Sequence, residues 1–279
     1  MIALHLPSNL PTAGQNFDLC TISKTIWSNK CCNNRRCAAL PTLVARVQLG
    51  YQEIANPMTT DKSTTFTLAQ MQEKLYCAVV SDALDSMGLR RQSPRIALPP
   101  VTGVGKIVGR CKTTLWEDMA HEDSRPYELE LQVVDNCKPG EIILCAAAGS
   151  MRSGIWGELL STAARNSGCV GAIVDGAVRD ISKMTEMQFP VFARGACVYD
   201  SLHRQRVVDV DVPVEIDGVR FEPGDLVFAD IDGIVVVPRE AEREAIQRAW
   251  DKVHAENKTR DEIRAGSKAA AVFAKYGIL

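Results

Sequence analysis

Three charged residues in the middle of the sequence have types and a spacing that suit a divalent cation and an anionic substrate. Glu158 precedes the dipeptide Arg179-Asp180, and a predicted helix and an apolar run lie between them. Carboxylate oxygens are the ligands that Mg²⁺ prefers, and they also suit Mn²⁺. A guanidinium offers a planar pair of donors to a carboxylate or an enolate oxygen. These residue types therefore indicate metal-assisted chemistry on an organic acid.

Each of these residues also has an ordinary structural explanation. An acid in the first turn of a helix stabilises the helix dipole, and an Arg-Asp pair often forms a surface salt bridge. The dipeptide is not specific, because Arg260-Asp261 is a second copy of it. Only the first copy has an acid at the upstream position, since the matching position for the second copy is Arg239. On these residues alone, a functional and a structural interpretation both stay open.

A helix is predicted to begin beside Glu158. Residues 149–157 are rich in glycine and lead into the segment 158–168, which reads as a helix with Gly168 as its C-cap. The first N–H groups of a helix have no partner within it, so they bind anions such as a carboxylate. The candidate anion donors are the backbone N–H groups near Gly157, Glu158, Leu159 and Leu160.

A buried strand is predicted to deliver the other two residues. The apolar run 171–174 is typical of such a strand, and Asp175-Gly176 predicts a turn directly after it. Arg179 and Asp180 would then lie at the exit of the strand and face the helix N-terminus. Positions of this kind commonly line sites in α/β folds.

The surrounding motifs carry a resemblance to a known family. Glu158 and Arg179-Asp180, together with VDGAVRD, FPVFARG, PGD and ADIDGIVVVP, resemble the RraA-like aldolase family. This family includes 4-hydroxy-4-methyl-2-oxoglutarate (HMG/CHA) aldolases and the protein regulators of ribonuclease E. The resemblance runs from about Phe66 to the C-terminus. It implies one layered α/β/β/α domain of the swivelling-domain-like type, followed by C-terminal helices.

The resemblance also implies roles for individual residues. Asp180 would ligate a divalent metal, Mg²⁺ or Mn²⁺, and Glu158 would hold metal-bound water. Arg179 would bind the pyruvyl part of the substrate and stabilise the developing enolate, while the backbone N–H groups of Leu159 and Leu160, beside Gly157, would hold its carboxylate.

The family resemblance further implies a site shared between subunits of a homotrimer or homohexamer. A glutamate from the C-terminal helix of a neighbouring subunit completes the site in the aldolase branch. Alignment on Gly266 identifies this residue as Glu256.

The function implied is that of a class II pyruvate aldolase, which cleaves a 4-hydroxy-2-oxo acid such as 4-hydroxy-4-methyl-2-oxoglutarate to pyruvate. The same site would also decarboxylate oxaloacetate. One alternative is a non-catalytic regulator that binds a ribonuclease, but such regulators have glycine at the position of Glu158. Another is a metal-dependent lyase or hydratase of a different oxo-acid or sugar acid. A class I mechanism needs a desolvated lysine, and the nearest, Lys183, is expected to point to solvent.

The chain divides near residue 58. Residues 1–57 contain few acids and four cysteines, namely Cys20, Cys31, Cys32 and Cys37. Zinc is disfavoured because there is no CxxC pair. We expect a disordered or non-native extension, with translation beginning at Met58 and the domain spanning residues 58–279.

The rest of the sequence alternates strand-like and helical segments, as mixed α/β domains do. Helices are predicted over residues 66–88, 239–256 and 259–275, the last interrupted near Gly266. Two PG turns, at Pro139-Gly140 and Pro223-Gly224, each lead into a strand. Residues 113–131 have no family counterpart and are expected to shape the distal end of the substrate site. The predicted strands cover residues 106–116, 141–147, 171–175, 190–198, 207–214, 225–230 and 233–238.

Composition excludes several classes of protein. The formal net charge of -2 and a pI near 6.1 provide no basic surplus for nucleic acid. No long apolar run predicts a membrane span, and the N-terminus lacks a signal-peptide pattern. The six cysteines after residue 58 are placed singly in apolar segments, as in proteins of a reducing compartment. We therefore expect a cytoplasmic protein whose substrate is a small oxo-acid.

Overall fold

The computed structural model describes residues 65–278, which fall within a compact unit spanning Lys62–Leu279. The predictions for residues 1–57, including the four cysteines and the start at Met58, lie outside the described residues. Within residues 65–278, no helix is both long and apolar enough to cross a membrane.

A mixed eight-stranded sheet forms the centre of the unit, in the order β10-β9-β1-β2-β4-β3, with β5 beside β4 and β6 beside β1. Strands β2, β3, β4 and β5 are parallel to their neighbours, whereas β6, β9 and β10 pair antiparallel. A hairpin of β7 and β8 is separate. The strands are β1 (Lys106–Asp118), β2 (Glu141–Ala146), β3 (Gly154–Trp156), β4 (Gly171–Val178), β5 (Val191–Ala196), β6 (Gln205–Val210), β7 (Val214–Ile216), β8 (Val219–Phe221), β9 (Leu226–Asp230) and β10 (Gly233–Val237).

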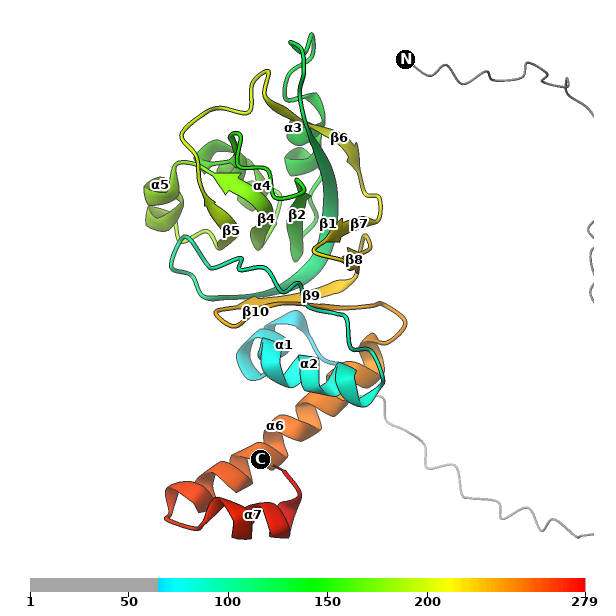
Figure 1. The fold of residues 1–279 in the computed structure, drawn as a ribbon, viewed down its shortest axis with the longest axis vertical. Coiled ribbons are helices and arrows are strands. Elements are labelled where there is room, and N and C mark those ends of the chain that lie inside the picture. Colours follow the sequence, from blue (N-terminus) through cyan, green and yellow to red (C-terminus); the bar gives the residue numbers. More distant parts are fainter. Residues whose placement is uncertain (1–64, 279) are drawn as a thin grey trace, which may run out of the picture. The chain divides into compact units, whose positions relative to one another are not determined.

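Helices cover the sheet in two groups (Figure 1). Helices α3, α4 and α5 lie beside β2, β4 and β5, while α1, α2 and α6 lie beyond β9 and β10. The helices are α1 (Leu68–Lys74), α2 (Cys77–Ser86), α3 (Glu128–Asp135), α4 (Glu158–Asn166), α5 (Ile181–Glu186), α6 (Glu242–Arg264) and α7 (Ala269–Tyr276).

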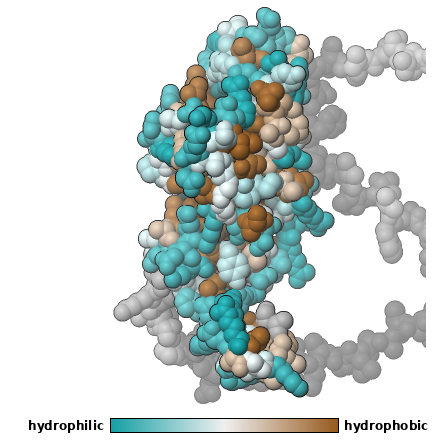
Figure 2. All heavy atoms as spheres, turned by 90° about the vertical axis from the view of Figure 1, so that its left-hand side faces the viewer, coloured by the Kyte–Doolittle hydropathy of each residue, from teal (hydrophilic) through white to brown (hydrophobic). Residues whose placement is uncertain are grey.

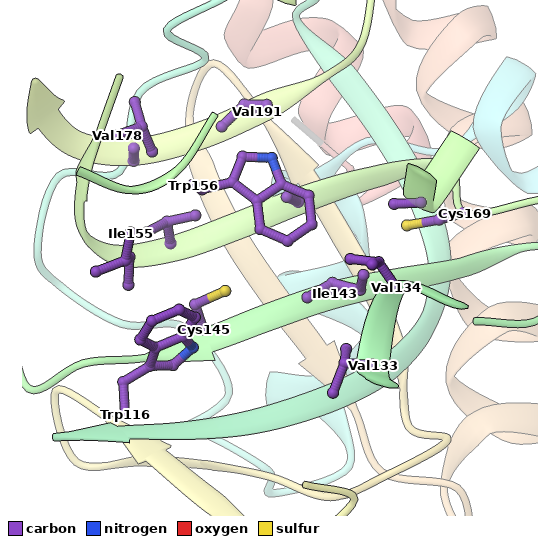
Figure 3. Close-up of a cluster of buried hydrophobic side chains, with 14 of the residues drawn as sticks. Trp116, Val133, Val134, Ile143, Cys145, Ile155, Trp156, Cys169, Val178 and Val191 are labelled. Atoms are coloured by element: carbon purple, nitrogen blue, oxygen red, sulfur yellow. The ribbon is translucent and has the colours of Figure 1, made fainter. Parts of the chain in front are cut away.

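Three clusters of buried hydrophobic side chains fill the space between the layers. In the first, shown in Figure 3, Val134 of α3 and Ile143 of β2 pack with Trp156 of β3. In the second, Ile142 of the same β2 strand packs with residues of β7 to β10. Because neighbouring residues of a strand point to opposite faces, Ile142 and Ile143 reach different cores. In the third, Phe228 of β9 packs with α1, α2 and α6. This confirms the predicted α/β/β/α layers and C-terminal helices.

The apolar runs predicted as strands are strands in the structure. Both faces of β4 and β9 are covered, so all their residues are buried and the runs show no polar alternation. The two PG turns are also confirmed: Gly140 and Gly224 have φ values of 82° and 86°, which only glycine adopts without strain. The structure adds β3, β8, α3 and α5, which were not predicted, and the strand predicted over residues 207–214 ends at Val210, with β7 beginning at Val214.

Two predicted boundaries were wrong. The turn at Asp175-Gly176 does not form, because β4 continues to Val178; Gly176 is needed there since a Cβ would lie 3.0 Å from the Ser150 carbonyl oxygen. In the C-terminal region, the predicted break between residues 256 and 259 does not form, because α6 runs from Glu242 to Arg264. The predicted interruption near Gly266 is confirmed, since α7 begins only at Ala269 and Gly266 has a φ of +97°.

The helix predicted over residues 66–88 is divided into α1 and α2. Leu75 has an extended backbone and is fully buried, and the N–H of Cys77 donates to the Asp230 carboxylate at 2.7 Å. A contact from β9 thus replaces a local helical hydrogen bond at the start of α2.

Candidate active site

Helix α4 begins directly after β3, in the place predicted from the sequence. Gly157 is its N-cap, with an extended φ of −158°, and Glu158 is its first residue. The indole N–H of Trp156 donates to the Ser161 hydroxyl at 2.8 Å, and that hydroxyl donates to the Gly157 carbonyl at 2.9 Å. These bonds fix the first turn to the buried strand. The Glu158 carboxylate accepts from Thr162 at 3.0 Å and stays partly exposed.

Asp180 lies next to this helix start. It is the N-cap of α5 and has a left-handed backbone, with φ of 55°, a conformation that aspartate tolerates better than most residues. Its Oδ2 atom is 3.4 Å from the backbone nitrogen of Glu158. A Cβ on Gly157 would be only 2.7 Å from the same oxygen. The structure therefore brings Gly157, Glu158 and Asp180 together, and glycine is what allows their close approach.

Arg179 is held by a second acid. Its Nη2 atom is 2.8 Å from Oδ2 of Asp200, and its Nε is 3.8 Å from the Asp180 carboxylate. Asp200 also accepts hydrogen bonds from the Tyr127 hydroxyl at 2.7 Å and from the Leu202 N–H at 2.8 Å. Desolvation raises the pKa of Asp200, but these two hydrogen bonds and the Arg179 charge together lower it. Asp200 thus stays ionised and orients the guanidinium.

A cavity of about 260 Å³ connects Gly157, Arg179, Asp180 and Asp200, whereas Glu158 is not among the residues that line it. Its walls come from α3, from the β3–α4 junction, from the end of β4 and from the loop before β6. They combine apolar surface with a few charged groups, as small-molecule sites do. The cavity is lined by Tyr127, Glu130, Leu131, Gly154, Ile155, Trp156, Gly157, Leu159, Leu160, Arg179, Asp180, Asp200 and Ser201.

The wall formed by α3 contributes residues that the sequence interpretation missed. Glu130 is buried, and desolvation together with the charge of Asp200 raises its pKa to about 8, against the opposing effect of Arg179. Tyr127 has a left-handed backbone, and burial followed by its bond to Asp200 raises its pKa to about 12. Helical spacing offered a signal, because Glu130 shares a face with the apolar Val133 and Val134.

The acids at the cavity suit a metal that keeps part of its water shell. Within residues 65–278, no group of three or more His, Cys, Asp or Glu side chains gathers around one point. Asp180 lines the cavity and Glu158 begins the adjacent helix, so they could supply one or two carboxylates. This is the protein contribution that Mg²⁺ typically takes, with water and substrate oxygens completing the shell. These residues fit Mg²⁺ or Mn²⁺ and do not fit a closed structural zinc site.

Glu256 does not join this cavity within one chain. It lies on α6, accepts a hydrogen bond from the Tyr76 hydroxyl at 2.7 Å, and is 3.6 Å from Arg260. It lines a separate cavity of about 310 Å³ with Thr259 and residues of the following turns. Lys183 also stays outside the site, since it is exposed and pairs with Glu186, as expected from the sequence.

Comparisons with known proteins place this chain in a family. The sequence model of the RraA-like family (Aldolase/RraA) matches residues 77–236. A protein of Halalkalibacterium halodurans named "Putative 4-hydroxy-4-methyl-2-oxoglutarate aldolase" is 32% identical over 173 residues, which cover 62% of this chain and 77% of that protein. Protein DlpA of Legionella pneumophila is 26% identical over 199 residues, which cover 71% of this chain but 32% of DlpA.

Solved structures show the same relationship. An uncharacterised protein from Pseudomonas syringae pv. tomato is 29% identical and superposes with a TM-score of 0.64. The match covers 74% of this chain and 95% of that one. RraAS2 of Streptomyces coelicolor, described as an unusual member of the RNase ES inhibitor RraA protein family, is 28% identical, with a TM-score of 0.61 over 69% of this chain and 94% of its own. Because the matched region includes Glu158, Arg179 and Asp180, and the fold agrees, this chain belongs to the RraA-like (Aldolase/RraA) family.

Proposed function

We propose that the protein is a divalent-metal-dependent pyruvate aldolase that cleaves a 4-hydroxy-2-oxo acid, such as 4-hydroxy-4-methyl-2-oxoglutarate, to pyruvate. One observation carries the proposal: Arg179, Asp180 and the N-terminus of α4 meet at one cavity, and the backbone nitrogen of Glu158, the first residue of that helix, lies 3.4 Å from the Asp180 carboxylate. The Arg179 guanidinium, the Asp180 carboxylate and the first backbone N–H groups of α4 lie in one small site. This combination suits a small oxo-acid better than it suits a protein partner.

The pyruvyl end of the substrate would bind at the start of α4. The backbone N–H groups of Leu159 and Leu160 are in the first turn and have no partner within the helix, so they suit the substrate carboxylate. Arg179, oriented by Asp200, would reach the oxygen that becomes the enolate. Asp180 would hold Mg²⁺ or Mn²⁺, which supplies Lewis acidity to the 2-oxo group when bound.

The chemistry then needs a proton acceptor and charge stabilisation. Glu158 would orient a water molecule that takes the proton of the 4-hydroxyl group. The C3–C4 bond breaks, its electron pair passes to the 2-oxo group, and Arg179 stabilises the resulting enolate charge. Protonation at C3 gives pyruvate, and the remaining fragment leaves as a carbonyl compound. Oxaloacetate would give the same enolate by loss of CO2, so decarboxylation is an expected side activity.

We further propose a homotrimer or homohexamer in which Glu256 of the partner subunit completes each site. Glu256 is largely buried but lies outside its own chain's catalytic cavity. Large hydrophobic side chains are exposed, among them Leu159 of the cavity wall at 76% and Val198 at 85%, and hydrophobic residues gather on the upper part of the face in Figure 2. The six cysteines of the described residues are all free, which suits the cytoplasm.

Pyruvate release from a panel of oxo-acids, coupled to lactate dehydrogenase, tests the proposed function. We expect turnover of 4-hydroxy-4-methyl-2-oxoglutarate or 4-carboxy-4-hydroxy-2-oxoadipate with Mg²⁺ or Mn²⁺. EDTA should abolish it and excess metal should restore it. Turnover of other oxo-acids or sugar acids only would indicate a different lyase or hydratase. The similarity to RraAS2 favours a ribonuclease regulator as the second candidate, and inhibition of a ribonuclease without any pyruvate release would overturn the enzyme proposal.

Replacing Gly157 with alanine should lower kcat/KM for pyruvate release about 100-fold, because small displacements of catalytic groups have effects of this size. The extended backbone of Gly157 accepts alanine, so the fold should persist. The new Cβ, however, would force the Asp180 carboxylate to move. Gly105→Ala is the matched control, since a Cβ there has nothing within 4 Å. Equal activity of the two variants would contradict the assigned role of this contact.

A further inference from the structure

Glu130 is an acid with no partner in the wall of the catalytic cavity. It is 7% exposed, and no hydrogen bond or ion pair links its carboxyl to another of the described residues. The residues on the same face of α3, Val133 and Val134, belong to the apolar core. Burying a carboxyl without a partner lowers stability. Such a group is explained if its partner is a molecule that enters the cavity.

The charges around Glu130 determine which partner it suits. The charges of Asp200 and Arg179 have opposite effects on the pKa of Glu130. Tyr127 lies at the same end of α3 as Glu130, and the Cys145 thiol of β2 faces Glu130 from the sheet. Burial and then the charge of Asp200 raise the pKa of Glu130 to about 8, against the opposing charge of Arg179, so the carboxyl is protonated at pH 7. A protonated carboxyl donates a hydrogen bond, and the strongest acceptor for it is an anionic oxygen.

We propose that Glu130 is a specificity-determining residue that donates a hydrogen bond to a carboxylate on C4 of the substrate, at the end distant from the pyruvyl group. The inference rests on the proposed function and deepens it. The pyruvyl group is assigned to Arg179 and the start of α4, which leaves the α3 wall of the same cavity for the substituents of C4. The protein would thus select 4-hydroxy-2-oxo diacids over monoacids of the same shape.

Two substrates that differ at one group test this selection. 4-Hydroxy-4-methyl-2-oxoglutarate has a carboxylate on C4, whereas 4-hydroxy-4-methyl-2-oxopentanoate has a methyl group there, and both release pyruvate on cleavage. We expect the wild-type protein to prefer the diacid in kcat/KM and Glu130→Leu to lose that preference by about 10- to 100-fold. Glu130→Gln keeps a donor and should retain most of it. Glu128→Leu, on the exposed face of α3, is the matched control and should behave as wild type.

Three further readouts separate recognition from a structural role. Binding of oxalate, which resembles the pyruvate enolate but has no distal group, should be equal in wild type and Glu130→Leu. The melting temperature of Glu130→Leu should rise by about 2–4 °C, because an unpartnered buried acid is removed. Diacid preference should fall in wild type as pH rises through about 8, where Glu130 becomes an anion that repels the C4 carboxylate, and should stay flat in Glu130→Gln.

Failure of the proposed aldolase activity and failure of the role of Glu130 would give different experimental results. Absence of pyruvate release by wild-type protein from either substrate overturns the aldolase, and calorimetric binding of the two compounds then still measures the preference due to Glu130. The same diacid-to-monoacid ratio in Glu130→Leu and Glu128→Leu overturns the role of Glu130, whatever the activity of the enzyme.

Discussion

Replacement of Arg179 with alanine should lower kcat/KM for pyruvate release on the order of 10³-fold, an effect typical of removing a preorganised group that stabilises developing negative charge. Arg179 is half-buried and Asp200 holds its guanidinium in one orientation at 2.8 Å. The enolate charge therefore meets a cation that needs no reorganisation. Arg220→Ala, an exposed arginine on β8, is the control and should keep full activity. Circular dichroism would show that both variants remain folded.

Mixing this variant with Glu256→Ala tests the shared site at the same time. Arg179→Ala and Glu256→Ala should each have very low activity alone. In a mixed oligomer, some sites would combine an intact Arg179 with Glu256 of the partner subunit, so activity should return after subunit exchange. Inactivity of a mixture shown to contain hybrid oligomers would contradict a site that spans two subunits, and wild-type activity of Arg179→Ala would contradict the role of the guanidinium.

Replacement of Asp180 with asparagine should lower the metal-dependent kcat/KM for pyruvate release, again by about 10³-fold. A Lewis acid contributes several kcal/mol to such a reaction. Asparagine preserves the shape and the left-handed backbone of the α5 N-cap but not the negative charge. Calorimetry with Mn²⁺ should show tight binding to wild type and a large loss of affinity in the variant.

The chain supplies a matched control for this substitution. Asp261 follows Arg260 as Asp180 follows Arg179, but it is exposed on α6 and far from the cavity residues in sequence. Asp261→Asn should bind Mn²⁺ and turn over substrate as wild type does. Unchanged Mn²⁺ affinity in Asp180→Asn would exclude Asp180 as the ligand.

The sequence alone determined the class of fold and supplied the candidate residues of the site. Apolar runs such as residues 171–174 and 233–237 lack polar alternation because both of their faces are covered, and this is visible without coordinates. Glu158, Arg179 and Asp180 were found by residue type and spacing, since each stands where a local element begins or ends.

Only the tertiary structure decided what surrounds those three residues. Tyr127 and Glu130 come from α3 and Asp200 from the loop before β6, and they meet Arg179 through contacts between distant parts of the chain. The division of α1 from α2 has the same origin, because Asp230 of β9 captures the N–H of Cys77. Local propensity and periodicity report on a few successive turns or strand residues, whereas these partners are selected by packing across the layers. The sequence could therefore predict candidate residues for metal and pyruvyl binding, but not the cavity wall that α3 forms.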